Sequence, residues 1–328
     1  YRHLDKFNRI KTVFTIHNIA YQGKYGLDIL EDTCGIGARD AHVVEYDGCA
    51  NFMKGAIETA DKVTTVSPTY AQEILDPWFS HGLDGLLRQK QYKTCGILNG
   101  IDVDVFNPAT DPDIAKNYDV NTVAEGKAVC KAALQDEMNL HKDGSPVMAM
   151  VTRLVGHKGV DLVRAIAEGL LQQGIELVVL GSGEAQYENF FNELCARNPG
   201  RVGVYIGFSA QLAQRIYAGA DMFLMPSRSE PCGLAQMVSC RYGTIPIVRE
   251  TGGLKDSIHD SGDGFGNGFT FANYNAHELY EACWRAKEGY WQKDGWPILV
   301  RRAMECDFSW ANSAKSYEGL YNEVVNLW

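Results

Sequence analysis

Short apolar segments alternate with longer amphipathic segments along most of this chain. The apolar segments are about four to six residues long and have few polar positions, which is typical of parallel strands buried on both faces of a sheet. The amphipathic segments have the spacing of helices. The alternation predicts a doubly wound α/β fold. The predicted strands are 12–16, 62–66, 147–152, 177–180, 202–206, 222–225 and 245–248, and the predicted helices are 126–138, 160–173, 185–195 and 210–218.

The alternation is most regular between residues 147 and 271, and a segment of different composition precedes it. Residues 107–113 are rich in Pro, Asn and Asp, and we interpret them as a linker. We therefore expect one domain at 1–106, a second at 107–310, and a C-terminal helix at 311–328 that crosses back to the first domain.

The first predicted domain has only two or three convincing strands, which is too few for a complete doubly wound domain. The chain also begins with Tyr1 rather than with Met. We therefore expect the first domain to be incomplete and the chain to start inside a longer gene product.

The net charge, the apolar runs and the cysteine pattern argue against several classes of protein. The chain has 31 Lys and Arg against 41 Asp and Glu, a formal charge of -10, so nonspecific binding to nucleic acid or to an anionic membrane surface is not expected. No apolar run reaches the roughly 18 residues that a membrane-spanning helix needs. The nine cysteines include no CxxC pair, a pattern that favours free thiols in a reducing cytoplasm.

A guanidinium and an ammonium follow the predicted strand 147–152. Arg153 and Lys158 flank a glycine-containing turn at the start of the next predicted helix. Arg binds two phosphate oxygens at once, Lys supplies a point charge, and ligands of open α/β sheets bind beyond the carboxyl ends of the strands. The pair predicts a diphosphate site. The alternative is a solvated helix start capped by Asp161.

Three other strand ends carry polar or glycine residues. Glu230 precedes a Pro-Cys-Gly-Leu segment and could bind sugar hydroxyls, or it could be a surface carboxylate near a helix start. Cys232 has no neighbouring His that would activate it, so we interpret it as a packed thiol. The Gly252-Gly253 pair allows close approach of a ligand or simply a tight turn. His17 follows the first predicted strand and is by itself more typical of a structural residue.

Two further patterns are weak. Asp102-Val103-Asp104 could bind a divalent cation, but no other carboxylates cluster nearby and we interpret it as a turn. Gly181-Ser182-Gly183 lacks the third glycine of a dinucleotide fingerprint, since Gln186 stands in its place. A dehydrogenase is therefore a distant alternative.

Taken together, these segments are far more specific than any one alone. In this order along the chain, they closely resemble the bacterial glycogen synthase and plant starch synthase family, which are retaining glycosyltransferases of the GT-B fold. The segments are Thr15-Ile-His-Asn-Ile-Ala-Tyr-Gln-Gly23, Thr65-Val-Ser-Pro-Thr-Tyr70, Gly96-Ile-Leu-Asn-Gly-Ile-Asp102, Arg153-Leu through Lys158-Gly-Val-Asp161, Glu230-Pro-Cys-Gly-Leu234, and Arg241-Tyr-Gly-Thr-Ile-Pro through Arg249-Glu-Thr-Gly-Gly-Leu254.

The resemblance implies two Rossmann-like doubly wound domains that face each other across a cleft, the first incomplete here. It also implies transfer of glucose from ADP-glucose to the non-reducing 4-hydroxyl of an α-1,4-glucan (glycogen or starch), with retention and with no metal or other cofactor. The implied location is the bacterial cytoplasm, or a plastid if the source is a plant or alga. The pattern gives no oligomeric state.

The same resemblance implies binding or catalytic roles for individual residues. Arg153 and Lys158 match the pair that neutralises the leaving diphosphate, and Glu230 matches the glutamate that binds the transferred glucose. His17 and Asn18 match the motif of the first domain that faces this glucose. Contacts to phosphate, sugar or adenine are implied for Cys232, Gly233, Leu234, Ala235, Thr251, Gly252, Gly253 and Phe208.

The sequence also departs from the family pattern. The family's N-terminal Lys-x-Gly-Gly-Leu loop is absent, so we expect this chain alone to bind ADP weakly and not to elongate glucan. Ala235 stands where threonine is common, and His157 stands where glutamine usually precedes the lysine.

Other functions stay open at this point. One is a UDP-glucose-dependent GT-B enzyme of the sucrose synthase or sucrose-phosphate synthase type. Another is a non-catalytic fragment that binds nucleotide sugar or glucan. A glucan phosphorylase would need a pyridoxal lysine, which we cannot identify.

Overall fold

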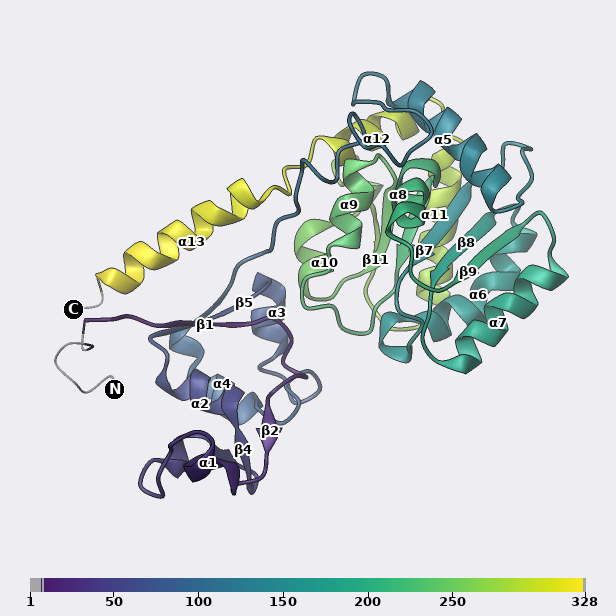
Figure 1. Cartoon of the computed structure of the whole chain (residues 1–328). Helices are drawn as coiled ribbons and strands as arrows, with labels where there is room; N and C mark the ends of the chain where they lie inside the picture. The colour runs from purple at the N-terminus through teal and green to yellow at the C-terminus, as the bar shows by residue number, and fades with distance from the viewer. Residues whose placement is uncertain (1–6, 8, 327–328) are drawn as a thin grey trace. The chain divides into compact units, whose positions relative to one another are not determined.

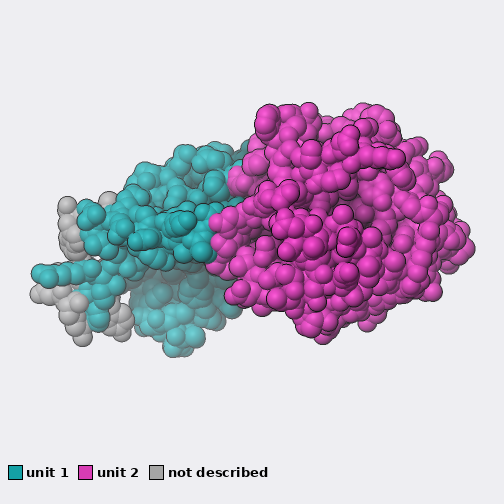
Figure 2. All heavy atoms as spheres, turned by 90° about the horizontal axis from the view of Figure 1, so that it is seen from above, with its two compact units in different colours: residues 1–99, 311–328 teal, residues 100–310 magenta. Residues whose placement is uncertain are grey.

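The computed structural model describes residue 7 and residues 9–326. Contacts divide the chain into two compact units, which we describe separately (Figures 1 and 2). Unit 1 comprises residues 1–99 and 311–328, and unit 2 comprises residues 100–310. The contacts thus divide the chain after residue 99, whereas the sequence analysis placed the boundary after residue 106.

Unit 2 contains a six-stranded parallel sheet in the order β12-β11-β10-β7-β8-β9. Every strand predicted in this part of the chain is present, and its ends differ from the prediction by at most one residue. The strand β12, which is only three residues long, was not predicted. The bounds are Val147–Val151 for β7, Glu176–Gly181 for β8, Val202–Ile206 for β9, Met222–Met225 for β10, Ile245–Arg249 for β11 and Phe269–Phe271 for β12.

Helices cover both faces of this sheet, which explains why its strands are apolar throughout. The helices α5, α8 and α9 pack beside one another on one face, and α6, α7 and α11 on the other (Figure 1). Met148, Val178 and Phe223 on the central strands are completely buried. The bounds are Val123–Glu137 for α5, Val160–Gln172 for α6, Ala185–Arg197 for α7, Ala210–Gly219 for α8, Ala235–Arg241 for α9, Gly252–Ser257 for α10, Ala276–Tyr290 for α11 and Gly295–Met304 for α12.

Unit 1 has a parallel sheet in the order β1-β5-β6 and a small antiparallel sheet in the order β2-β4-β3. The parallel strands are Val13–Ile16, Lys62–Thr65 and Thr94–Gly96, and the antiparallel ones in chain order are Lys24–Tyr25, Glu45–Tyr46 and Cys49–Asn51. Its helices are α1 (Ile29–Asp32), α2 (Phe52–Thr59), α3 (Pro68–Glu73) and α4 (Asp84–Gln89).

The C-terminal helix α13 (Trp310–Val325) contributes to the core of unit 1. Leu320 and Val324 on this helix are buried in one cluster with Ile97. Glu323 forms an ion pair with Lys62 on β5. An apolar face together with a charged contact therefore fixes this helix within the unit.

The expectation of a linker at 107–113 was wrong, because this segment is packed against unit 2. Asp111 is only 2% exposed and accepts a hydrogen bond of 2.5 Å from the Tyr242 hydroxyl. Nearby, the Tyr118 hydroxyl donates to the Tyr242 carbonyl oxygen at 2.8 Å. Polar turn residues can lie inside a domain when their side chains find such partners, and composition alone does not distinguish the two cases.

The described residues also show the state of the cysteines and the character of the helices. All nine cysteines are free thiols. No helix in the described ranges combines the length and the apolar character that crossing a bilayer requires.

Candidate active site

The residues predicted to bind a nucleotide sugar lie at the carboxyl edge of the sheet in unit 2. Arg153 follows β7, Phe208 follows β9, Glu230 follows β10 and the turn 251–253 follows β11. Since all six strands are parallel, their carboxyl ends meet at one edge, where ligands of open α/β sheets bind.

A tight turn positions Lys158 at this edge. Residues Gly156–Lys158 form one turn of 3₁₀ helix, and Gly159 follows with a φ of 75° before α6 begins. A Cβ atom at Gly159 would lie 2.0 Å from the Pro226 carbonyl oxygen. Only glycine allows both this backbone conformation and this close approach, so Gly159 fixes the turn against the loop after β10.

Lys158 forms an ion pair with Glu230. Its Nζ donates to Glu230 Oε2 at 2.7 Å, and the Ser227 hydroxyl donates to the same oxygen at 3.0 Å. Glu230 is only 6% exposed. A buried carboxylate needs such partners, so the pair fixes both side chains at the edge of the sheet.

Arg153 is exposed and its guanidinium lies beside His157. The distance from Arg153 Nη2 to His157 Nε2 is 3.4 Å. Within the described part of the chain, Arg153 contacts His157 and forms no ion pair with a carboxylate, so its remaining donors are available to an anion. Partial burial and the neighbouring cations Lys158 and Arg153 lower the pKa of His157 below its ordinary value.

The loop that carries Glu230 packs backbone against backbone with residues 251–253, which form the N-cap and the first two residues of α10. A Cβ atom at Gly252 would lie 2.0 Å from the Glu230 carbonyl oxygen, and one at Gly253 would lie 2.1 Å from the Cys232 carbonyl oxygen. Both glycines are therefore required for packing. The Cys232 side chain is buried, as the interpretation of a packed thiol predicted.

The remaining predicted residues of unit 2 differ in exposure. Phe208 is 90% exposed, so the whole ring is available for contact with a flat ligand. Leu234 is 46% exposed and directly precedes α9, which begins at Ala235. Gly233 has a φ of 70°, and Thr251 is completely buried.

His17 and Asn18 follow β1 in unit 1, so the structure describes them separately from the residues above. His17 is exposed. The Asn18 side-chain oxygen accepts from the Ala20 backbone N–H at 2.9 Å and thereby shapes the turn after β1.

Sequence reasoning missed Tyr274, which braces the turn that carries Lys158. Its hydroxyl donates to Asp161 Oδ1 at 2.5 Å and lies 3.2 Å from the Gly156 carbonyl oxygen. The Arg228 guanidinium lies 4.6 Å from the centre of the Tyr274 ring. Burial and the bond to Asp161 raise the pKa of Tyr274. No local motif marks this residue, because it lies in the loop between β12 and α11, more than a hundred positions from Gly156 and Asp161.

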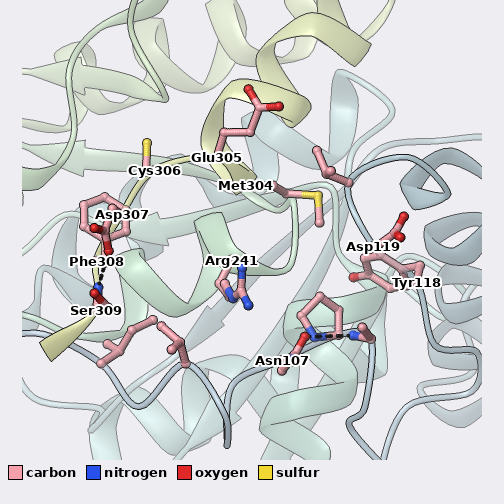
Figure 3. A pocket seen from close by; sticks show the side chains of 15 residues that line it. Asn107, Tyr118, Asp119, Arg241, Met304, Glu305, Cys306, Asp307, Phe308 and Ser309 are labelled. Carbon is pink, nitrogen blue, oxygen red and sulfur yellow. Dashed lines mark hydrogen bonds between the residues drawn. The ribbon is translucent and has the colours of Figure 1, made fainter. Parts of the chain in front are cut away.

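Unit 2 also contains a pocket of about 570 Å³ that includes none of the predicted site residues (Figure 3). Arg241 points into it, and its Nε donates to the Phe106 carbonyl oxygen at 3.3 Å. The nearby Asp102 side chain accepts from the backbone N–H groups of Asp104 and Val105, both at 3.0 Å, which confirms the turn interpretation of this motif.

Two family models match the chain. The starch synthase catalytic domain matches residues 1–89, and the glycosyl transferases group 1 model matches residues 133–290. The glycogen synthase of Geobacillus thermodenitrificans is 47% identical over 330 aligned positions that cover 99% of this chain and 68% of that protein. The chain belongs to the glycogen synthase and starch synthase family. It spans about two thirds of the length of the curated glycogen synthases that it matches.

Solved structures agree with membership of the glycogen synthase and starch synthase family. The catalytic domain of starch synthase IV from Arabidopsis thaliana, bound to ADP and acarbose, matches with a TM-score of 0.88 and 37% identity over 96% of this chain and 67% of that chain. Sucrose-phosphate synthase from Thermosynechococcus elongatus matches with a TM-score of 0.60 at 18% identity, over 95% of this chain and 67% of that one, and supports the fold alone. The predicted GT-B fold and the predicted family are confirmed, and this family consists of glycosyltransferases.

Proposed function

We propose that the chain takes part in glucosyl transfer from ADP-glucose to the non-reducing 4-hydroxyl of an α-1,4-glucan, with retention of the anomeric configuration. One observation carries this proposal: Lys158 and Glu230 form an ion pair beside the exposed Arg153 at the carboxyl edge of the sheet. The similar starch synthase IV was solved with ADP and acarbose, a nucleoside diphosphate and a saccharide, which supports this choice of ligands.

In this reaction, the bond between the anomeric carbon and the diphosphate oxygen breaks. Negative charge develops on the diphosphate, and the sugar becomes cationic. Arg153 and Lys158 are fixed cations that stabilise the developing negative charge, and loss of one such group commonly costs about 10²–10³ in rate. The buried Glu230 is suited to accept hydrogen bonds from glucose hydroxyls once Lys158 turns to the phosphate.

The other predicted residues complete the assignment. The exposed Phe208 ring is suited to contact adenine, and the 251–253 turn and the segment 232–235 are suited to offer backbone contacts to phosphate and sugar. His17 and Asn18 are proposed to contact the transferred glucose from unit 1. We infer front-face attack assisted by the leaving phosphate, since we assign no residue as a covalent nucleophile; a trapped glucosyl adduct would overturn this step.

The function is tested by calorimetric titration of the 328-residue chain with ADP and, separately, with UDP. ADP is expected to bind more tightly than UDP, and Arg153→Ala or Lys158→Ala to weaken ADP binding at least tenfold (about 1.4 kcal/mol or more). The control is Lys142→Ala, since Lys142 forms an exposed ion pair with Asp136 and such pairs contribute little. Preference for UDP, or ADP binding that is unchanged in both site variants, would reject the proposal.

A further inference from the structure

His157 adjoins both cations of the proposed diphosphate site and has no role in the function proposed above. It belongs to the 3₁₀ turn Gly156–Lys158, next to Lys158 in sequence and 3.4 Å from Arg153. The Arg228 backbone N–H donates to the His157 carbonyl oxygen at 2.9 Å, which ties the backbone of this turn to the loop after β10. The imidazole is exposed at the edge of the sheet and can reach a ligand there.

The contact with Arg153 favours the neutral form of His157 when no ligand is bound. Arginine has no acceptor, so the pairing of Arg153 Nη2 with His157 Nε2 requires that Nε2 accepts and carries no proton. His157 is then neutral, with its proton on Nδ1. A second proton would place an imidazolium against a guanidinium, which is unfavourable.

The charged groups around His157 agree with this state. Partial burial disfavours protonation of the imidazole, and so do the neighbouring cations Lys158 and Arg153. Two carboxylates act in the opposite direction: Glu230, from the loop after β10, and Glu184, at the start of α7. Glu184 is held at the same turn, because its Oε1 accepts from the Gly156 backbone N–H at 3.2 Å. Together these groups lower the pKa of His157 and favour the neutral ring.

A nucleoside diphosphate brings about two to three negative charges to the same place, and this reverses the balance. We propose that His157 takes up a proton from solvent at Nε2 when a nucleoside diphosphate binds, while Arg153 turns from the imidazole to the phosphate. The imidazolium then binds the phosphate oxygens as a third cation. This inference rests on the proposed function, because it requires the diphosphate to lie between Arg153 and Lys158.

The inference predicts that ADP binding and proton uptake are linked. Histidine titrates within the range of about pH 5 to 8, so the ADP affinity of the wild type relative to that of His157→Gln should increase as the pH falls through this range. By linkage, each pKa unit that ADP adds to His157 can strengthen binding up to about tenfold. Glutamine has a similar size and cannot take up a proton, so His157→Gln is the matched control.

The experiment is calorimetric titration of the 328-residue chain with ADP in two buffers of equal pH and different ionisation enthalpy, such as PIPES and Bis-Tris. The difference in observed enthalpy gives the number of protons taken up. ADP itself can exchange protons, and its contribution is equal in the wild type and in His157→Gln. We expect the wild type to take up measurably more protons than the variant at about pH 7, because the neutral His157 gains a proton when ADP binds and glutamine cannot.

A second measurement follows His157 directly. The ring C–H resonance of His157, assigned by its loss in His157→Gln, should titrate with a midpoint about one pH unit higher when ADP is present. Equal proton uptake by the two proteins, together with an unmoved midpoint, would overturn the inference while leaving ADP binding intact. Absence of ADP binding in the wild type would instead overturn the proposed function and this inference with it.

Discussion

Lys158 Nζ lies 2.7 Å from Glu230 Oε2, although the two residues are 72 positions apart in the sequence. The pair aligns the lysine at the edge of the sheet, but it also offers Lys158 an anion that competes with a bound diphosphate. A nucleotide that binds at the proposed site is expected to displace part of this interaction. The competition gives the Glu230 carboxylate an effect on nucleotide affinity that can be measured separately from its proposed contact with glucose.

Glu230→Gln should therefore strengthen ADP binding and weaken discrimination in favour of ADP-glucose. Removal of the carboxylate frees Lys158 and lowers the negative charge beside the phosphates, which is expected to raise ADP affinity about fivefold (about 1 kcal/mol). The affinity of ADP-glucose relative to ADP should fall, because the proposed sugar contact is weakened. Calorimetric titration with both ligands measures this ratio.

Glu305→Gln is the control for this prediction, since Glu305 is an exposed carboxylate that pairs with Arg301 at 3.0 Å. It should leave both affinities unchanged, because exposed ion pairs have small effects. If Glu230→Gln behaves like Glu305→Gln, then Glu230 touches neither ligand and its pairing with Lys158 is only structural.

Tyr274→Phe should weaken ADP binding with little loss of stability. The change removes the hydroxyl that bonds Asp161 and contacts the Gly156 carbonyl oxygen, so the turn that carries Lys158 loses a brace. The ring remains beside Arg228. Loss of about 1 kcal/mol, typical of one hydrogen bond, corresponds to about a fivefold weaker affinity for ADP.

The same substitution elsewhere in unit 2 separates positioning from general destabilisation. The Tyr290 hydroxyl accepts from Lys131 Nζ at 3.0 Å, so Tyr290→Phe removes a comparable bond. Thermal melting should show similar small losses of stability for both variants, while only Tyr274→Phe changes ADP affinity. Equal effects of the two variants on affinity would count against a positioning role for Tyr274.

The sequence predicts those parts of the fold and of the candidate site that depend on residues close together in the chain. The strands β7 and β10 were predictable because Met148 and Phe223 belong to continuous apolar runs, which require burial on both faces. The motif residues Arg153 and Glu230 could be placed at strand ends for the same reason. The position of each residue at the end of a strand follows from the apolar run that precedes it in the sequence.

The contacts between motifs were not predictable from spacing. Lys158 meets Glu230 because β10 pairs with β7, and this strand order follows from the topology of the whole sheet rather than from either segment. Tyr274 reaches Asp161 through a loop that no pattern marks. The local composition around Asp111 predicts a linker, because its partner, the Tyr242 hydroxyl, lies 131 positions away and leaves no local signal.

Gly159→Ala should destabilise the chain and abolish most ADP binding. Gly159 has a φ of 75° and a Cβ at this position would lie 2.0 Å from the Pro226 carbonyl oxygen. The variant must shift the turn that carries Lys158. Gly174→Ala is a matched control, since Gly174 has a φ of 76° and nothing lies within 4 Å of its Cβ position.

Both variants require alanine in the left-handed region, which costs about 1–2 kcal/mol. Only Gly159→Ala adds the steric clash, so its unfolding free energy should be lower than that of Gly174→Ala by at least about 1 kcal/mol. Denaturant unfolding measures this difference, and calorimetry measures ADP affinity. Equal stability and equal ADP affinity of the two variants would show that the approach to Pro226 is not a constraint.

Lys127 should make the stability of the chain depend on pH. Its Nζ donates to the Thr244 hydroxyl at 2.7 Å and to the Ala218 carbonyl oxygen at 3.0 Å, and burial lowers the pKa of Lys127 to about 7. An unfolded lysine has a pKa of about 10.4, so between about pH 7 and pH 10 the unfolded state binds more protons than the folded state. By linkage, the contribution of this residue to stability increases as the pH rises through that range.

The comparison with Lys127→Met isolates this contribution, because all other titrating groups are present in both proteins. The variant loses the hydrogen bonds of Lys127 and should be less stable than the wild type at about pH 10, where the wild type no longer pays for burying an ammonium and the buried carbonyl oxygens of the variant lack a donor. The difference in unfolding free energy between wild type and variant should grow by about 1 kcal/mol or more for each pH unit between about pH 8 and pH 10. Denaturant titrations at several pH values give this difference. A constant difference over the range would mean that the Lys127 ammonium stays charged in the folded state, held by the oxygen atoms around it.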